Sequence, residues 1–157
     1  MSSQDQGKQH PVPYTREQMQ TTLWSWQYTF RHGQCDPAGI VYTPEFFNVF
    51  NHAIEHWFEE SLGLSYYDIL GPRQIGLGYV SASAEFFTPV LMGEEVEIFV
   101  QIREIGGKSY SLELNAFKGD REALRGKFTT VTTSLETHSS IKIPADIRMA
   151  LSGYGKS

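Results

Sequence analysis

Cysteine is almost missing from this 157-residue chain, and Cys35 is the only one. A single cysteine excludes an intrachain disulfide and a metal cage built from thiolates. It also fits a reducing compartment, so we expect the protein in the cytoplasm. Positive charge is scarce as well, because 13 Lys and Arg residues stand against 18 Asp and Glu residues, for a net charge of -5. That balance argues against a protein that binds nucleic acid through a basic surface.

Long apolar runs are missing too, since none approaches the roughly 20 residues of a membrane span, and we expect no membrane partner. What the chain does have is enough apolar side chain for one core: hydrophobic residues make up 40% and aromatic residues 13%. Such a composition is typical of a globular domain. We predict one domain over residues 21–151, a flexible polar arm over 1–20 and a short tail over 152–157.

The hydrophobic pattern predicts five strands and one long helix. Alternation of apolar and polar side chains indicates strands over residues 23–31, 77–88, 94–105, 109–118 and 122–137. Between the first two, Thr43-Pro44 is interpreted as the cap and first position of an amphipathic helix that ends at Gly63. A short final helix is expected after Pro144. Gly126 breaks the phase of the last strand and is interpreted as a bulge.

The order of these elements predicts an α+β fold. Short turns between the last four strands imply antiparallel neighbours in one sheet. The long helix is the one element able to cover a face of that sheet, so we expect a curved antiparallel sheet wrapped around a central helix. A single helix covers such a sheet incompletely. We therefore also expect a homo-oligomer, formed through the remaining apolar surface or a sheet edge.

The loop before the helix, residues 34–42, is the candidate catalytic segment. Asp36 lies a few residues before the helix start, where unpaired backbone N–H groups and a partial positive charge can stabilise an oxyanion. A carboxylate there can take a proton from water or attack a carbonyl itself. These parts suit acyl transfer or hydrolysis. The alternative is that Asp36 only caps its own turn before Pro37, a common role for aspartate.

Several segments of the chain resemble the 4-hydroxybenzoyl-CoA thioesterase family. The most specific is Asp-Pro-Ala-Gly-Ile-Val-Tyr over residues 36–42, followed by the aromatic helix. Residues 88–98 (TPVLMGEEVEI), 105–112 (IGGKSYSL) and 143–151 (IPADIRMAL) are similar to later segments of the family. The resemblance covers roughly residues 22–151, which is nearly the whole predicted domain.

The resemblance implies the hot-dog fold, a five-stranded antiparallel sheet around one long helix, assembled into homodimers or homotetramers. It implies hydrolysis of an acyl-CoA, with Asp36 as nucleophile or general base. The oxyanion would bind a backbone N–H near Tyr42 or Thr43. No metal and no separate cofactor is expected, because coenzyme A is part of the substrate and its thiolate leaves readily.

Substrate contacts are expected from Lys108 and Ser109, near the phosphates of coenzyme A, and from Phe50 in the acyl pocket. An aromatic pocket would favour a small aromatic or medium apolar acyl group. The chain departs from the family at Gln34, where many relatives carry an acidic residue, and at Thr43, where some carry histidine. These departures leave the substrate open, and they keep a second hypothesis, a non-catalytic protein that binds acyl thioesters.

The helix offers two further alternatives. Residues 52–56 match His-x-x-Glu-His, the inverted zinc-protease pattern, although a polar helix face with His56 packed beside Trp57 is the favoured interpretation. Glu55 or Glu59 could serve instead of Asp36, since some hot-dog thioesterases use a glutamate on the helix. A hot-dog dehydratase is disfavoured, because the loop has no histidine to pair with its aspartate.

Overall fold

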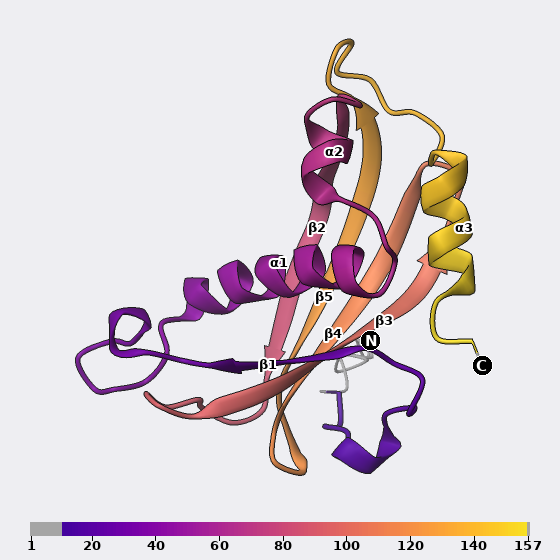
Figure 1. Ribbon diagram of the computed structural model, residues 1–157. Helices are drawn as coiled ribbons and strands as arrows, with labels where there is room; N and C mark the ends of the chain where they lie inside the picture. The colour runs from indigo at the N-terminus through magenta and orange to yellow at the C-terminus, as the bar shows by residue number, and fades with distance from the viewer. Residues whose placement is uncertain (1–10, 157) are drawn as a thin grey trace, which may run out of the picture.

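The structure is a computed structural model that describes residues 11–156. Its centre is a five-stranded sheet in the order β1-β3-β4-β5-β2 (Figure 1). Every neighbouring pair in that sheet is antiparallel. The strands are β1 (Ser25–Thr29), β2 (Ile75–Phe86), β3 (Glu95–Ile105), β4 (Ser109–Lys118) and β5 (Arg121–Ser134). The prediction of one antiparallel sheet of five strands is confirmed.

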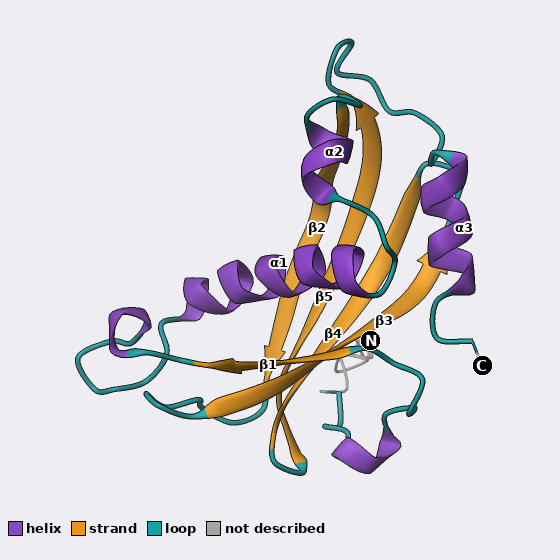
Figure 2. Ribbon diagram, in the orientation of Figure 1, coloured by secondary structure: helices purple, strands orange, loops and turns teal. Residues whose placement is uncertain are grey.

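The long helix α1 (Thr43–Glu60) crosses one face of the twisted sheet, as Figure 2 shows. Its apolar side chains are buried against the strands, which confirms the α+β prediction. They recur at steps of three and four residues because that spacing lines one side of a helix. The buried set is Phe46, Val49, Phe50, Ala53, Ile54, Trp57 and Phe58. None of the helices within residues 11–156 is both long enough and apolar enough to cross a membrane.

The helix begins at Thr43, one residue before Pro44, the first helical position expected from the sequence. Tyr42 occupies the cap position with extended backbone angles (φ -68°, ψ 128°), and Thr43 is the first helical residue. Pro44 is therefore the second, where its missing N–H still costs nothing. The helix ends at Glu60, and Gly63 follows in the turn with a φ of 68°.

Gly126 is not the bulge that the sequence pattern indicated. The irregular position between β4 and β5 lies at Ala116/Phe117, whereas Gly126 pairs regularly with Leu114. A Cβ atom on Gly126 would lie 2.7 Å from ring carbons of both Phe50 and Phe128. Glycine is needed here because the helix packs its ring directly on the strand backbone.

Two shorter helices flank α1. The expected C-terminal helix is α3 (Ala145–Gly153), whereas α2 (Tyr66–Leu70) was not predicted from the sequence. The core extends past the expected boundary at residue 151. The ring of Tyr154 packs edge-on against Trp57 with centroids 5.0 Å apart, and its hydroxyl donates to the Val100 carbonyl at 2.7 Å.

The second half of the expected arm, residues 11–20, lies against the outer face of the sheet. That face contains a buried ion pair, with Nη2 of Arg125 2.6 Å from Oε1 of Glu122. The Tyr14 N–H donates to the same carboxylate at 2.9 Å, and the Arg125 guanidinium stacks 4.0 Å from the Tyr14 ring centroid. The segment is held because it shields buried charges from water. Residues 1–10 lie outside the described part of the chain.

Candidate active site

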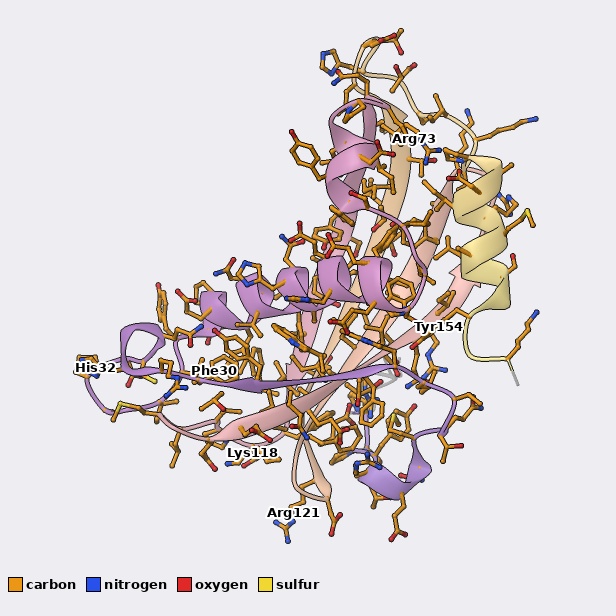
Figure 3. The ribbon with its side chains drawn as sticks, in the orientation of Figure 1. Phe30, His32, Arg73, Lys118, Arg121 and Tyr154 are labelled. Atoms are coloured by element: carbon orange, nitrogen blue, oxygen red, sulfur yellow. The ribbon has the colours of Figure 1, made fainter. Side chains whose placement is uncertain are left out.

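The segment between β1 and α1 folds back on itself as a short ladder. His32 lies at its outer end, away from the helix (Figure 3). Backbone pairing joins Gln34 to Tyr42, Cys35 to Val41 and Asp36 to Ile40. Gly39, with a φ of 78°, closes the turn in a conformation that favours glycine. The ladder therefore holds Asp36 beside the turn, a fixed few residues from the first turn of α1.

One oxygen of the Asp36 carboxylate is already engaged. Its Oδ1 accepts hydrogen bonds from the N–H groups of Ala38 at 2.9 Å and Ile40 at 3.1 Å. The turn-capping role considered for Asp36 is therefore real. Oδ2 has no hydrogen-bond partner among residues 11–156, and the side chain is exposed. Capping orients the carboxylate and leaves its second oxygen for chemistry, so the two roles are compatible.

The start of α1 presents one unpaired N–H group. The Tyr42 N–H donates to the Gln34 carbonyl at 2.8 Å, Pro44 has none, and the Glu45 N–H donates to the Tyr42 carbonyl at 2.9 Å. Within the described chain no acceptor faces the Thr43 N–H. Of the two expected donors, only Thr43 is free, and it lies where the helix dipole is most positive.

Thr43, which carries this N–H group, is one of the residues that line an apolar cavity of about 230 Å³. Among residues 11–156, Thr43 and Thr88 contribute the only polar side chains of its lining. Phe46 and Phe86 meet edge-on across it, with ring centroids 5.6 Å apart. The full lining is Ile40, Val41, Thr43, Phe46, Phe86, Phe87, Thr88, Pro89 and Val90. Such a cavity suits an apolar group whose polar end reaches the helix start.

The outer wall of the cavity is the segment between β2 and β3, and it is tied on both sides. The Val41 N–H donates to the Val90 carbonyl at 3.0 Å on the loop side. On the sheet side, Lys118 Nζ donates to the Pro89 carbonyl at 2.9 Å and lies 2.9 Å from Glu94. Burial raises the pKa of Glu94, but hydrogen bonds from Lys118 and the Leu91 N–H outweigh it and hold that pKa below its usual value. The wall is therefore fixed by charge as well as by backbone bonds.

The structure does not bring all predicted substrate residues to this cavity. Phe50 is 1% exposed and packs in the core, and Phe46 takes its place in the cavity lining. Lys108 and Ser109 lie at the turn between β3 and β4. The length of β3, about 35 Å, separates them from the loop of Asp36 within one chain. Asp36 itself is in the loop beside the cavity and does not line it.

The other functional residues considered on the helix were the His-x-x-Glu-His pattern over residues 52–56 and the glutamates Glu55 and Glu59. The ring of His56 stacks on that of Trp26 in β1, with centroids 4.8 Å apart. Glu55 and Glu59 are exposed on the outer side of α1. Across residues 11–156 no group of three or more His, Cys, Asp or Glu side chains is arranged to hold a metal ion.

Phe86 and Phe87 are among the cavity residues that the sequence analysis did not anticipate. Phe86 is the last residue of β2 and Phe87 follows it, and both line the same cavity as Thr43 at the helix start. A local signal exists, since two adjacent aromatic residues break the alternation of the strand just before Thr88-Pro89. That signal marks an unusual strand end, but not what the strand end packs against.

Comparison with known proteins places this geometry in context. The sequence profile of the Thioesterase-like superfamily matches residues 30–151. A 1,4-dihydroxy-2-naphthoyl-CoA hydrolase of Gloeothece citriformis is 27% identical over 94 residues, which are 60% of this chain and 65% of that protein. The chain therefore spans just under two thirds of that relative.

Solved structures give the same picture. A gentisyl-coenzyme A thioesterase superposes with a TM-score of 0.73 at 28% identity, over 80% of this chain and 99% of the other. A 1,4-dihydroxy-2-naphthoyl-CoA thioesterase from Synechocystis superposes with a TM-score of 0.78, over 86% and 99% of the two chains. At 20% identity, the second likeness shows the fold alone.

Proposed function

The chain belongs to the Thioesterase-like superfamily, and from this premise we propose that it hydrolyses an acyl-CoA to the free acid and coenzyme A. The hot-dog fold expected from the sequence is confirmed by the superfamily match, and the names of the relatives support the thioester hydrolase class. Membership of the narrower 4-hydroxybenzoyl-CoA thioesterase family stays a prediction.

The observation that carries the proposal is the unpaired Thr43 N–H beside an apolar cavity, with Asp36 in the same loop. The acyl group would occupy the cavity and its carbonyl oxygen would accept from the Thr43 N–H. As the carbonyl carbon is attacked, negative charge develops on that oxygen, where the helix dipole and the N–H stabilise it. The C–S bond then breaks, and the thiolate departs without help from a metal or a separate cofactor because thiols are far more acidic than alcohols.

Oδ2 of Asp36 supports either of two routes. As a general base it takes a proton from water, and the resulting hydroxide adds to the carbonyl carbon. As a nucleophile it adds to that carbon itself, which gives a mixed anhydride that water then cleaves to the acid and free Asp36. In both routes the proton lost by water ends on the leaving thiolate or in solvent. We propose both the general-base and the nucleophilic route, because Oδ2 of Asp36 can act in either.

The cavity lining supports a small aromatic or medium apolar acyl group. Two threonine hydroxyls are the only side-chain partners for polar substituents on the acyl group. A hydroxyl buried without a partner costs about 1–3 kcal/mol. We therefore propose that unsubstituted small aryl and medium-length alkyl thioesters are better substrates than the dihydroxylated aryl thioesters named for the relatives.

A homodimer or homotetramer is part of the proposal. Strand β2 is an edge of the sheet, and it exposes Tyr79, Val80 and Phe86 by 36%, 66% and 47%. Pairing of β2 with β2 of a second copy would cover these side chains and the open backbone of the edge. In such an assembly Lys108 and Ser109 could act only on the site of another chain. The cytoplasm remains the proposed location.

Thiol release from a panel of acyl-CoA thioesters tests the proposal. Benzoyl-CoA, hexanoyl-CoA and 2,5-dihydroxybenzoyl-CoA differ in the size and polarity of the acyl group alone. We expect turnover of the first two, with a kcat/KM about tenfold or more above that of the third. No thiol release from any member would contradict the enzyme proposal.

The second candidate function is binding of acyl thioesters without hydrolysis. It is favoured by one observation, that Asp36 is exposed, caps its own turn and lies outside the cavity lining. Thermal stabilisation by acyl-CoA without thiol release would support this candidate. Thiol release that Asp36→Asn abolishes would exclude it.

A further inference from the structure

All four hydrogen-bonding groups of Gln34 are engaged, which is unusual for a residue in a surface loop. Its N–H donates to the Arg31 carbonyl at 3.0 Å, and its carbonyl accepts from the Tyr42 N–H at 2.8 Å. Its side-chain Oε1 accepts from the Arg31 N–H at 3.0 Å, and its Nε2 donates to the Tyr28 hydroxyl at 2.8 Å. The orientation of the amide is fixed, since only an oxygen can accept from the Arg31 N–H.

Tyr28 joins Gln34 to the rigid part of the fold. Its backbone pairs with Val96 across β1 and β3. Its ring packs between those of Trp26 and Phe30, at centroid distances of 5.3 and 5.1 Å. The hydroxyl that meets Gln34 is thus held by the sheet and by two aromatic neighbours. A loop residue tied to such a group moves little relative to the sheet.

The other end of this connection reaches the helix start. The Tyr42 N–H donates to the Gln34 carbonyl, and the Tyr42 carbonyl accepts from the Glu45 N–H. Both backbone polar groups of Tyr42 are therefore fixed. In a planar trans peptide the N–H points opposite to the carbonyl of the preceding residue. The Tyr42 carbonyl points into the helix toward Glu45, so the Thr43 N–H must point out of the start of the helix, whose first residue lines the cavity.

We propose that Gln34 is a positioning residue: anchored on Tyr28, it aims the Thr43 N–H at the thioester carbonyl. This inference rests on the proposed function, and it assigns a role to the side chain at which the sequence departs from its family. Gln34 also uses up the Tyr42 N–H, which leaves Thr43 as the single donor. An N–H displaced by about 1 Å loses much of its effect on a transition state.

Three variants test the proposal by steady-state kinetics with benzoyl-CoA. Gln34→Met keeps the length of the side chain and removes both of its hydrogen bonds, so we expect kcat to fall at least tenfold while KM changes less than threefold. Tyr28→Phe removes the anchor alone and should lower kcat in the same way, with no further loss in the double variant. In Gln34→Glu the carboxylate accepts from both the Arg31 N–H and the Tyr28 hydroxyl. It should restore kcat to within fivefold of wild type at pH 8.

Gln101→Met is the matched control. Gln101 donates to Asn115 at 2.7 Å on the other face of the sheet, so the same substitution removes a hydrogen bond far from the loop. We expect it to lower the melting temperature and leave kcat unchanged. A kcat of Gln34→Met within threefold of wild type, or one no lower than that of Gln101→Met, would overturn the proposal. So would failure of Gln34→Glu to restore activity.

Hydrogen exchange separates this inference from the proposed function. The Tyr42 amide should exchange at least tenfold faster in Tyr28→Phe than in wild type, and at the wild-type rate in Gln101→Met. That readout needs neither turnover nor a folded Gln34→Met variant. Unchanged exchange in Tyr28→Phe would overturn the positioning role even in an active enzyme. An inactive wild type with accelerated exchange in the variant would overturn the proposed function and leave the positioning role supported.

Discussion

Replacement of Asp36 by asparagine is the sharpest perturbation of the proposed site, because it separates the two roles of the carboxylate. The amide oxygen of asparagine can accept from the Ala38 and Ile40 N–H groups that Asp36 Oδ1 now holds. The amide nitrogen takes the place of Oδ2 and can neither accept a proton from water nor attack a carbonyl. The turn is kept and the chemistry is removed.

The structure sets the size of both effects. The two turn bonds weaken because they lose the charge of the acceptor, which roughly halves such bonds. At an exposed site this amounts to about 1 kcal/mol or less, equivalent to a fall of about 2–4 °C in the melting temperature of a domain of this length. Loss of a general base raises the barrier by about 3–5 kcal/mol, so kcat should fall by about 10²–10⁴.

The assay is thiol release followed with a chromogenic disulfide, alongside thermal unfolding followed by circular dichroism. The protein contributes a single thiol, Cys35, so enzyme at catalytic concentration adds only a small, constant background. Asp68→Asn is the matched control, since Asp68 is an exposed aspartate on α2 outside the cavity. It should keep both activity and melting temperature.

Retention of more than a tenth of the wild-type kcat in Asp36→Asn would refute the assignment of the chemistry to Asp36. A helix glutamate would then become the candidate, to be tested by Glu55→Gln and Glu59→Gln. A melting temperature lowered by more than about 10 °C would instead show that the turn depends on the charge of Asp36. That result would contradict the interpretation that one oxygen caps the turn while the other is left for chemistry.

Three further outcomes follow from particular contacts. Thr43→Pro removes the free N–H of Thr43, and the first helical position tolerates proline. We expect kcat to fall about 10²–10³-fold with the fold kept, whereas Thr43→Ser, which keeps the N–H, should stay active. Equal activity of the two variants would contradict the role of that N–H. Gly126→Ala places a Cβ 2.7 Å from two phenylalanine rings and should cost about 1–3 kcal/mol in the free energy of unfolding, measured by denaturant titration; an unchanged midpoint would contradict the close packing of helix on strand. The paired guanidinium of Arg73 holds the pKa of Asp146 below its ordinary 3.8, so this carboxylate stabilises the fold above that pH and the stabilisation is lost as the pH falls through the lowered value. Asp146→Asn should therefore cost about 1 kcal/mol or less at pH 7, and the gap in melting temperature should narrow as the pH falls below 3.8; a gap that does not narrow would contradict this.

Local periodicity was enough for the elements of this protein. The strand predicted over residues 109–118 is observed with the same bounds, and the one predicted over 94–105 begins a single residue later. These patterns work because every second side chain of a half-buried strand meets the same core. The helix prediction succeeded for a similar reason, since the apolar side of the helix has to be buried whichever element packs against it. The short helices were not predicted: α2, with five residues, and the 3-10 helices Arg16–Gln18 and His32–Gln34 are too short for a helical period to be detected.

The site was predicted in part. The loop, Asp36 and the helix start follow from a contiguous motif, so the sequence places them together. Phe50 was assigned to the pocket and lies in the core. Core and pocket side chains of the helix follow the same helical period, and only the packing of the Phe50 ring against Gly126 shows that Phe50 is a core residue. Lys108 and Ser109 were assigned by resemblance, and the length of β3 keeps them away from the loop of their own chain.

The sequence by itself thus determined which segments form strands and helix, and which carboxylate stands before the helix, because those properties depend on neighbours a few residues apart. Tertiary structure alone decided which N–H is free, since Gln34 captures the Tyr42 N–H across a loop and leaves that of Thr43. It also decided the cavity, part of whose wall comes from the end of β2, and the cover over the outer face, which residues 11–20 provide. These features depend on pairs of groups distant in the chain, and no local pattern encodes which distant group will arrive.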